Sequence, residues 1–514
     1  MPCEMSALED VIRRRGLPGA MTRVLAASAG FLVILSATIA GAADLPRLER
    51  THCWFDIPAG HEAQCAYLYV AEDRGDAGSA EIRLPIARLK TPDQKAADDP
   101  VLFINGGPGG DAGLDANGIE NWWWYVDNNA WMRKRDFILM DVRGTGLTVP
   151  TLNCPEMDRG SAGGDGETNG FAGWIDRMLR NSDNCRDRLI ANGRHIAAYN
   201  SKSAAEDIVD FMSAAGIESM NIYGASYGTR IAFSLLRDHP QRVRSLVLES
   251  VLPPNADLVI QQQVGFGQVI SHIAADCAAD ANCNARYPDL EVRFRSRIED
   301  LNRSPVNIEI FNPASRSKQS YPLIGVDIVD VLFDLMYGSE SLRFMPTLLD
   351  GLSRGNEATL QSWFQAYRLR TSGPDTTSEG VYYAFACAEQ VAHVDMKVAA
   401  AAAARYALYN DDAVVGFSDY LICPRWPVTA VDESERQAVI SDKPVLLLSG
   451  EYDPVTPVAF ADKAAETLSR SYHFVLPNAG HSPLSHSLCA NEIAEAFLDD
   501  PTQRPPAACL DKLN

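Results

Sequence analysis

The sequence predicts an α/β fold in which a mainly helical segment interrupts the core. Between residues 43 and 255, short apolar runs that suit buried strands alternate with stretches of helical spacing. The strand pattern stops after Pro253-Pro254 and returns at Val445–Leu448. Such alternation is typical of a parallel sheet covered by helices on both faces. We therefore expect a core built from residues 43–255 and 433–514, with residues 256–432 inserted as a helical cap over the strand ends where α/β sheets bind ligands.

Local patterns place the individual elements. Ala66–Val70 and Ile82–Ala87 are expected to form the opening strands. A helix is expected from Ser201, which can cap its start, to Gly216, which can end it. Inside the insertion, the alanine-rich run Val398–Leu408 has high helix propensity. Further strands are expected at Val101–Ile104, Phe137–Met140, Met220–Tyr223, Leu246–Leu248, Val445–Leu448 and Phe474–Leu476.

Residues 1–42 have the pattern of a secretory signal peptide. Val24–Ala40 is nearly all apolar or small, arginines precede it at Arg13–Arg15, and Ala40-Gly41-Ala42 fits a cleavage site. The segment before Met21 is long for a basic leader, so Met21 is an alternative start. An uncleaved membrane anchor is the other alternative, although the run is shorter than the roughly 20 residues of a membrane span. We expect a secreted or periplasmic protein without stable membrane association after cleavage.

Cysteine usage agrees with export. The chain has 11 cysteines, and because Cys3 lies in the leader, 11 − 1 = 10 remain. An even number in a secreted chain suggests disulfides, although spacing leaves their connectivity open. Pairing each cysteine with its neighbour gives Cys53–Cys65, Cys154–Cys185, Cys277–Cys283, Cys387–Cys423 and Cys489–Cys509.

Charge and missing motifs exclude several classes of partner. The formal net charge of −21 argues against binding to nucleic acid or to anionic lipid. The chain contains no C-x-x-C, no H-E-x-x-H and no G-x-x-x-x-G-K sequence. We therefore expect neither a metal nor a nucleotide cofactor.

The most informative motif is the G-x-S-x-G pentapeptide Gly224–Gly228. A short apolar run, Met220–Tyr223, precedes it, and Thr229–Arg237 follows with apolar residues at helical spacing. Strand, tight turn and helix together are the context of a nucleophile elbow. The glycines allow the turn to be sharp, so Ser226 is expected to expose its hydroxyl above the sheet.

A serine nucleophile needs a base, and the base needs an acid that orients it. Asp453 and His481 each lie just past the end of a predicted strand, so their loops and the Ser226 turn would meet at one edge of the sheet. The order Ser226, Asp453, His481 is the α/β-hydrolase order. Glu451 is the local alternative to Asp453, and His486 is the nearest alternative to His481.

A glycine-rich loop, Asn105–Gly110, follows one predicted strand and suits an oxyanion hole. Glycines let backbone N–H groups approach a substrate oxygen. Tyr227, directly after the nucleophile, should supply one N–H, and Gly107 is our choice for the other, with Gly106 as the alternative. Pro108 has no N–H and can only shape the loop.

These motifs together resemble the secreted tripeptidyl aminopeptidases, relatives of the prolyl iminopeptidases within the α/β-hydrolase fold. Besides the pentapeptide, the resemblance is carried by Gly106–Gly110, Asp141–Gly146, the D-P-V-T-P loop at Asp453 and Gly480-His481. It implies an α/β-hydrolase fold with a large helical cap and a serine exopeptidase that acts on free N-termini. Tyr227 stands where prolyl iminopeptidases typically have tryptophan, which favours the tripeptidyl branch.

An exopeptidase must bind the ammonium of its substrate, so carboxylates near the mouth of the site are expected. Glu389 is our candidate, because the family resembled has a similar Cys-x-acid element to Cys387-Ala388-Glu389; an ordinary exposed glutamate is the alternative. Asn121–Tyr125 contains three tryptophans that could line an apolar subsite, but adjacent rings cannot all face one way. We expect Asp141 and Arg143 to brace the glycine loop.

The sequence thus predicts a secreted serine hydrolase whose substrates are peptides with a free N-terminus. Two alternatives use the same scaffold. One is an esterase or lipase with the same catalytic residues, and the other is an inert hydrolase fold that only binds a ligand.

Overall fold

The computed structural model describes residues 45–92, 97–157, 170–312, 316–355, 357–371, 377–395, 397–399, 401–402 and 417–513. The predicted signal peptide lies outside these ranges, as does most of the alanine-rich run. The part of that run that is described, within residues 397–402, is helical. Among the helices in these ranges, none combines the length and the apolar character that a membrane span requires.

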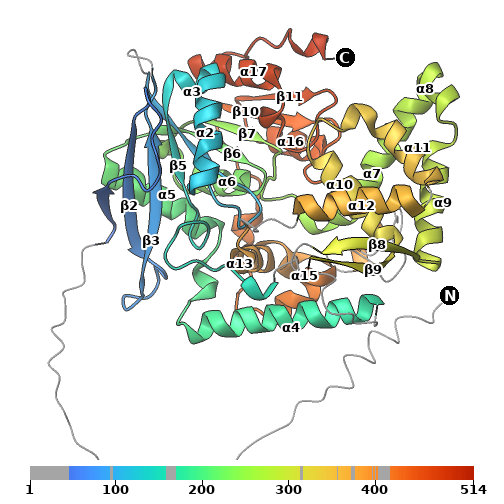
Figure 1. Ribbon diagram of the computed structural model, residues 1–514. Coiled ribbons are helices and arrows are strands. Elements are labelled where there is room, and N and C mark those ends of the chain that lie inside the picture. Colours follow the sequence, from blue (N-terminus) through green and yellow to red (C-terminus); the bar gives the residue numbers. More distant parts are fainter. Residues whose placement is uncertain are drawn as a thin grey trace, which may run out of the picture. The chain divides into compact units, whose positions relative to one another are not determined.

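A nine-stranded sheet carries the fold, in the order β1-β2-β3-β5-β4-β6-β7-β10-β11 (Figure 1). From β5 to β11 all neighbouring strands are parallel. The first strands correct our expectation of a parallel sheet, because β1, β2 and β3 pair antiparallel with one another and β3 pairs antiparallel with β5. Short turns can join only antiparallel neighbours, whereas parallel strands need a longer crossover. The strands are β1 (Arg47–Thr51), β2 (Ala63–Ala71), β3 (Glu81–Leu89), β4 (Ala97–Ile104), β5 (Arg135–Met140), β6 (Met220–Ala225), β7 (Val243–Glu249), β10 (Val445–Gly450) and β11 (Ser471–Leu476).

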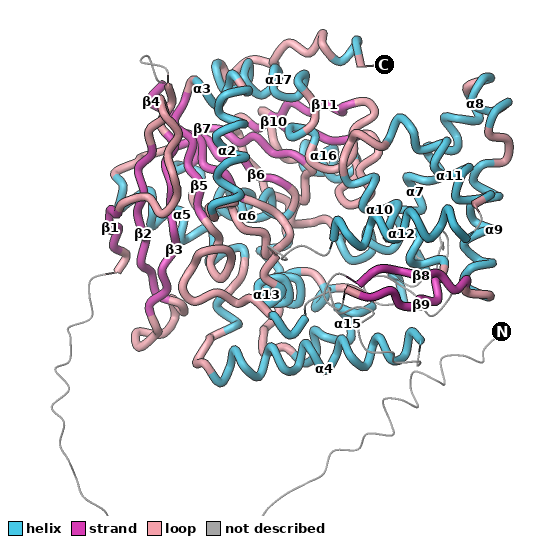
Figure 2. Tube along the Cα trace, in the orientation of Figure 1, coloured by secondary structure: helices cyan, strands magenta, loops and turns pink. Residues whose placement is uncertain are grey.

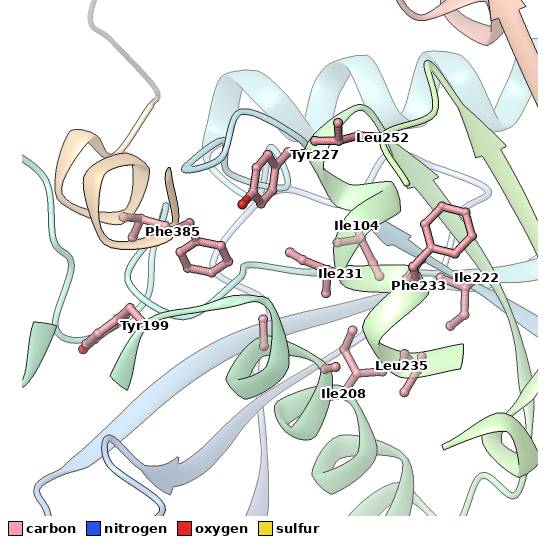
Figure 3. Packing of buried hydrophobic residues seen from close by; sticks show 14 of the residues in the cluster. Ile104, Tyr199, Ile208, Ile222, Tyr227, Ile231, Phe233, Leu235, Leu252 and Phe385 are labelled. Atoms are coloured by element: carbon pink, nitrogen blue, oxygen red, sulfur yellow. The ribbon is translucent and has the colours of Figure 1, made fainter. Parts of the chain in front are cut away.

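Helices cover both faces of this sheet, and successive strand residues point to opposite faces. Leu102 and Ile104 pack with α5 (Ser201–Ala215), α6 (Tyr227–Asp238) and α16 (Val458–Ala465). Their neighbours Val101 and Phe103 pack on the other face with α2 (Ala116–Asn128), α3 (Ala130–Arg133) and α17 (Leu488–Asp499). Figure 3 shows the first of these clusters around α6, where Ile231 and Leu235 lie near Ile222 of β6. The two-sided burial explains why the strands are continuous apolar runs.

The inserted segment, which we propose as the cap, has two parts. Its first part has an apolar core of its own. It contains α7 (Leu258–Ala279), α8 (Ala281–Arg286), α9 (Leu290–Arg303), α10 (Gly325–Tyr337), α11 (Met345–Arg354) and α12 (Glu357–Thr371), with the antiparallel pair β8 (Val306–Asn312) and β9 (Ser317–Leu323). Figure 2 shows this pair apart from the main sheet. We did not predict these two strands.

The second part of the insertion packs on the main core. Helix α13 (Glu379–Glu389) and the short α15 (Phe417–Ile422) contribute Phe385 and Ile422 to the cluster around α6. Phe385 lies edge-on to Tyr227, with ring centroids 6.0 Å apart (Figure 3). Helices α13 and α15 are therefore continuous with the core in their packing, although they belong to the insertion in sequence.

Helix α5 begins with a capping side chain, as expected, but the capping residue is not the one that we predicted. The residue that caps α5 is Asn200, whose side chain accepts a hydrogen bond from the Ser203 N–H at 2.8 Å. Ser201 is the first helical residue instead. Gly216 ends the helix with φ 70°, a left-handed conformation that glycine adopts without steric cost. A long helix that we did not predict, α4 (Gly170–Ala191), precedes α5.

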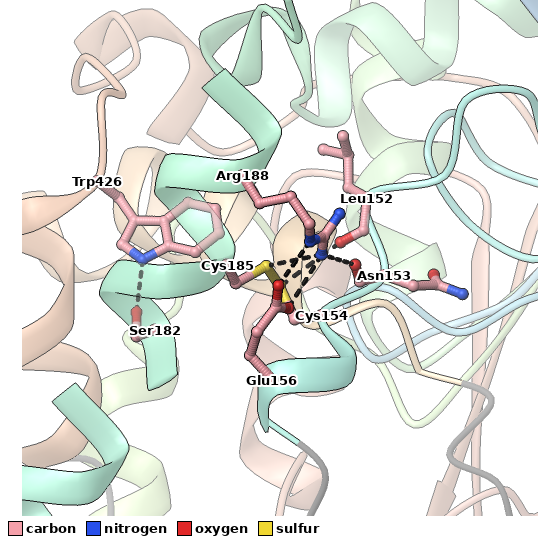
Figure 4. The surroundings of a disulfide bond; sticks show 8 residues. All are labelled: Leu152, Asn153, Cys154, Glu156, Ser182, Cys185, Arg188 and Trp426. Atoms are coloured by element: carbon pink, nitrogen blue, oxygen red, sulfur yellow. Dashed lines mark hydrogen bonds and ion pairs between the residues drawn. A yellow bond between two sulfur atoms is a disulfide. The ribbon is translucent and has the colours of Figure 1, made fainter. Parts of the chain in front are cut away.

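All five neighbouring cysteine pairs are joined as disulfides, which confirms the pairing that spacing left open. Figure 4 shows Cys154–Cys185, which ties α4 to the loop after β5. Within the described residues, the one group of side chains at metal-ligand spacing is Cys154, Glu156 and Cys185. Both sulfurs are consumed by the disulfide, and Glu156 pairs with Arg188, so this cluster offers no thiolate to a metal.

Disulfides of different span should contribute differently to stability. The Cys154–Cys185 bond closes a sequence separation of 31, and the Cys277–Cys283 bond a separation of 6. Because a longer loop loses more chain entropy when it is closed, replacing the first pair with alanine should cost about 1–2 kcal/mol more than replacing the second. Urea unfolding of the two double variants measures this difference. Equal costs, or a larger cost for the short loop, would contradict the expectation.

Candidate active site

The turn at Ser226 has the backbone of a nucleophile elbow. Ser226 lies between β6 and α6 with φ 53° and ψ −124°, a conformation that residues with a Cβ rarely adopt. Gly228 makes the turn possible, because a side chain there would overlap the carbonyl oxygens of Ile104 and Asn105. The first turn of α6 therefore lies directly against the end of β4.

Hydrogen bonds hold this strained turn in place. The Ser226 N–H donates to the carbonyl oxygen of Glu249 at 3.0 Å. The Thr229 hydroxyl donates to the Ser226 carbonyl oxygen at 2.6 Å and accepts from the Leu252 N–H at 2.8 Å. Both sides of Ser226 are thus anchored to the adjoining strand β7 and the residues that follow it.

Asp453 and His481 form a buried pair. His481 Nδ1 lies 2.8 Å from Asp453 Oδ2, and both side chains are fully buried. Asp453 also accepts hydrogen bonds from the N–H groups of Val455 and Thr456 and from the Thr456 hydroxyl. Burial opposes ionisation of Asp453, but the charge and hydrogen bond of His481, together with the Thr456 donors, outweigh it and lower the pKa of Asp453.

The ionised Asp453 sets the role of each imidazole nitrogen. Because an ionised carboxylate can only accept, His481 Nδ1 carries the hydrogen that it donates to Asp453, and in the neutral imidazole Nε2 then has the lone pair. Within the described residues this buried Nε2 has no hydrogen-bond partner. The pair therefore presents one free basic nitrogen.

The alternative acid, Glu451, and the alternative base, His486, have other partners. Glu451 accepts a hydrogen bond from the Asn478 N–H at 2.9 Å, and His486 pairs with Glu340 at 3.1 Å. Thr456, which the sequence analysis missed, joins Asp453 through the local turn of the D-P-V-T-P loop. The recognisable signal for this turn is the aspartate itself, since aspartate side chains accept hydrogen bonds from the backbone two residues on.

The glycine loop lies against the elbow. A Cβ at Gly106 would be 2.7 Å from the Cβ of Ser226 and 3.1 Å from the Tyr227 nitrogen, so only glycine allows this approach. The Gly106 N–H already donates to Asn105 Oδ1 at 2.8 Å. In the part of the chain that the structure describes, the N–H groups of Gly107 and Tyr227 have no acceptor. This difference favours Gly107 over Gly106 as an oxyanion donor.

Asp141 forms hydrogen bonds next to the glycine loop, whereas Arg143 does not. Asp141 accepts a hydrogen bond at 2.8 Å from the N–H of Ala112, two residues beyond the glycines, and another at 2.7 Å from the N–H of Leu147 in its own loop. Burial raises the pKa of Asp141 to about 7 against the effect of these donors. Arg143 instead binds Asp207, which corrects the expectation that both residues brace the glycine loop.

Two cap helices pack on the loops that carry Asp453 and His481. On one side, Tyr452 donates a hydrogen bond to Asp276 of α7 at 2.6 Å. On the other side, the Tyr337 ring at the end of α10 lies 4.5 Å from the His481 ring, centroid to centroid. Gly480 is packed so closely that a side chain would overlap the carbonyl oxygen of Met336. Both loops are therefore enclosed between the sheet and the cap.

Glu389 is buried, not exposed as we would expect of a carboxylate at the mouth of a site. It is 2% exposed and forms a buried ion pair with Arg230 at 2.6 Å. It also accepts hydrogen bonds from the Tyr227 hydroxyl at 2.8 Å and from the N–H and hydroxyl of Ser201. Four donors already satisfy this carboxylate, so its observed contacts join α13 to α5 and α6 in the interior.

The tryptophan run serves mainly in packing. Trp123 is buried and Trp124 is exposed, while Trp122 donates a hydrogen bond to the Ala112 carbonyl oxygen at 2.8 Å. Trp122 and Tyr125 line a cavity of about 280 Å³ behind the elbow. The cavity is further lined by Asn105, Ala225, Glu249 and Ser482, among others, each close in sequence or contact to a candidate site residue.

A second group of hydrogen-bonded serine, histidine and aspartate side chains shows that these three residue types alone do not make an active site. Ser449 Oγ lies 3.0 Å from His473 Nε2, and His473 Nδ1 lies 2.9 Å from Asp462. Ser449, however, is fully buried inside the regular strand β10. Because Ser449 lies within a strand and not in an exposed turn, we expect this group to be structural and use it as a matched control.

Two family models match the chain. One, described as alpha/beta hydrolase fold, matches residues 99–280, which include the glycine loop and the elbow. The other, described as TAP-like protein, matches residues 413–509, which include Asp453 and His481.

Curated relatives carry both peptidase and esterase names. Serine protease Hip1 of Mycobacterium tuberculosis is 26% identical over 489 residues, covering 88% of each chain. Carboxylesterase B of the same organism is 24% identical, covering 77% of this chain and 76% of its own. Tripeptidyl aminopeptidase of Streptomyces lividans is 25% identical over 214 residues, covering 40% of this chain and 39% of its own.

The buried position of Glu389 generates a stability prediction. Glu389→Ala should destabilise the protein by about 3–5 kcal/mol, because Arg230 would be left buried and uncompensated. The double variant Glu389→Leu, Arg230→Met should recover much of that loss, since no lone charge remains. Urea unfolding measures both, with Glu433→Ala as an exposed control expected within about 0.5 kcal/mol of wild type. A stable Glu389→Ala enzyme with a raised KM for free-amine peptides would restore the recognition role.

Proposed function

We propose that this chain, which has an α/β-hydrolase fold, is a serine hydrolase and, more narrowly, a secreted exopeptidase that acts on free peptide N-termini. Ser226 is the proposed nucleophile, His481 the base and Asp453 the acid that orients it. The observation that carries the proposal is the buried Asp453–His481 pair with its unbonded Nε2. An imidazole nitrogen that has a free lone pair can act as the general base for a serine hydroxyl, which supports this assignment of roles.

The proposed reaction proceeds through an acyl-enzyme. His481 Nε2 takes the proton of the Ser226 hydroxyl as its oxygen attacks the substrate carbonyl carbon. The N–H groups of Gly107 and Tyr227 then bind the resulting oxyanion, and each such donor contributes about 3 kcal/mol to transition-state stabilisation in comparable sites. The imidazolium gives its proton to the departing amine. Water, activated by the same imidazole, releases the acyl group from Ser226.

Peptide substrates and export are supported by separate observations. The relatives named serine protease Hip1 and tripeptidyl aminopeptidase support a peptide as the substrate class. Five disulfides suit an oxidising compartment and agree with the signal peptide that we propose for residues 1–42. The relative named carboxylesterase B favours ester hydrolysis as the second candidate function, because the same catalytic residues can serve both reactions.

Removing the nucleophile should abolish turnover without unfolding the protein. Ser226→Ala is expected to lower kcat by at least about 1,000-fold, as loss of a catalytic serine does elsewhere. Ser449→Ala is the matched control: it removes a buried serine from the second group of serine, histidine and aspartate side chains and should cost about 1 kcal/mol of stability but little activity. Steady-state kinetics and thermal unfolding of both variants test this. Near-wild-type activity of Ser226→Ala would sink the assignment.

A three-substrate comparison separates the two candidate functions. We expect a tripeptidyl amide with a free amine to show a kcat/KM at least about tenfold above its N-acetylated counterpart, a difference of roughly 1.4 kcal/mol in transition-state binding. The third substrate is an acyl ester whose phenol leaving group is the oxygen counterpart of the aniline released from the amides. Turnover of the ester alone would reject the peptidase, and equal turnover of the free and acetylated amides would reject recognition of the N-terminus.

A further inference from the structure

Glu249 is a buried carboxylate that the proposed reaction leaves unassigned. It ends β7, between the strand that leads to Ser226 and the strand that leads to Asp453. Its side chain is 1% exposed, and it lines the cavity behind the elbow. A buried carboxylate at such a strand end needs a reason, because removing it from water is costly.

The residue touches both the nucleophile and the loop of the base. Its carbonyl oxygen accepts the Ser226 N–H at 3.0 Å. Its carboxylate accepts the Leu484 N–H at 2.8 Å, three residues after His481. The next residue, Ser250, accepts the Ser482 N–H at 2.8 Å through its hydroxyl. Two consecutive residues of one strand end thus fix the Ser226 turn and the chain that follows His481.

Several titratable groups face the Glu249 carboxylate from different elements. Tyr223 of β6 donates a hydrogen bond to it, and His481 attracts it electrostatically. Asp453 repels it, and Tyr337 from the cap interacts with both acids. Burial raises the pKa of the Glu249 carboxyl, while Tyr223, Leu484 and His481 oppose that rise. His481 therefore lies in the field of two carboxylates rather than one.

We propose that Glu249 is a positioning residue of the catalytic site, which ties the histidine loop to the nucleophile elbow and stabilises the imidazolium of His481 with a second negative charge. The proposal rests on the proposed roles of Ser226 and His481. It assigns Glu249 no contact with the substrate. During acyl transfer the imidazole gains a proton, and an additional fixed carboxylate favours that charged state in a site of low polarity.

The variant Glu249→Gln removes the charge and keeps the shape. Because burial raises the pKa of Glu249, the neutral amide suits the interior at least as well, so the variant should fold. We expect kcat to fall about tenfold with KM nearly unchanged. The acid limb of the kcat/KM profile should move to lower pH by roughly one unit, since the imidazolium of His481 loses a neighbouring negative charge and releases its proton more readily.

Two further variants distinguish the effect of the negative charge of Glu249 from the effect of the hydrogen bonds that hold the histidine loop. Glu249→Asp keeps the charge on a shorter side chain, so the acid limb should stay near its wild-type position. Ser250→Ala removes only the brace to Ser482, so kcat should fall without a shift of the limb. If Glu249→Gln does not fold, the variant Tyr223→Phe replaces it in the test. Loss of the Tyr223 hydroxyl donor favours the protonated form of Glu249, so the acid limb of the kcat/KM profile should move to lower pH, by less than is expected for Glu249→Gln.

An unmoved acid limb and an unchanged kcat in folded Glu249→Gln would overturn the proposal, as would an unmoved limb in Tyr223→Phe if that variant replaces it in the test. The profiles are measured on whichever substrate class the enzyme turns over. An ester preference would therefore reject the peptidase function and leave this test intact. An active Ser226→Ala variant would instead reject the catalytic roles on which Glu249 depends.

Discussion

The close approach of two backbones at Ser226 is the constraint on which the site depends. Ser226 adopts a strained conformation that costs on the order of 1–3 kcal/mol. Gly228 lies against the end of β4, and Gly106 lies against Ser226 itself. The strain is offset by burial, because every residue of α6 from Tyr227 to Leu236 is buried in the core. The same contact brings the free N–H groups of Gly107 and Tyr227 to the proposed nucleophile.

The loops of the acid and the base depend on a different set of contacts. Apart from the hydrogen bond from His481, Asp453 receives its hydrogen bonds locally, from its own turn. His481 is held from two directions, by the strand end at Glu249 and Ser250 and by the cap residue Tyr337. The segment that we propose as the cap therefore also contacts the imidazole that we propose as the catalytic base. A change in the cap should consequently affect kcat as well as KM, because the two loops do not stand free of it.

Much of the site could be predicted because its residues lie in strong local patterns. The pentapeptide, the glycine loop and the order of Ser226, Asp453 and His481 depend on turn chemistry within a few residues. The burial of Glu389 was missed for the opposite reason: its partners Ser201 and Arg230 are 188 and 159 residues away in sequence. Nothing near Cys387 indicates that long-range burial. Glu249 was missed because an acid at a strand end resembles an ordinary loop residue until its contacts are known.

The fold shows the same division between local and distant causes. Continuous apolar runs predicted the central strands, since two-sided burial requires them. We missed the antiparallel start of the sheet and the β8–β9 pair. Whether a strand pairs parallel or antiparallel depends on which other strands lie beside it in the folded sheet, and this is a tertiary property. The attachment of α13 to the main core is likewise a tertiary effect, visible in the packing of Phe385 on Tyr227.

The central claim is that Ser226 is the activated nucleophile, and covalent labelling tests it most directly. A fluorophosphonate reacts with a serine only where a base and an oxyanion site assist the attack. Mass spectrometry of the labelled, folded protein should place a single adduct on the peptide containing Ser226, with none on Ser449. An adduct on another residue, or an unlabelled Ser226 in protein that still hydrolyses substrate, would contradict the account.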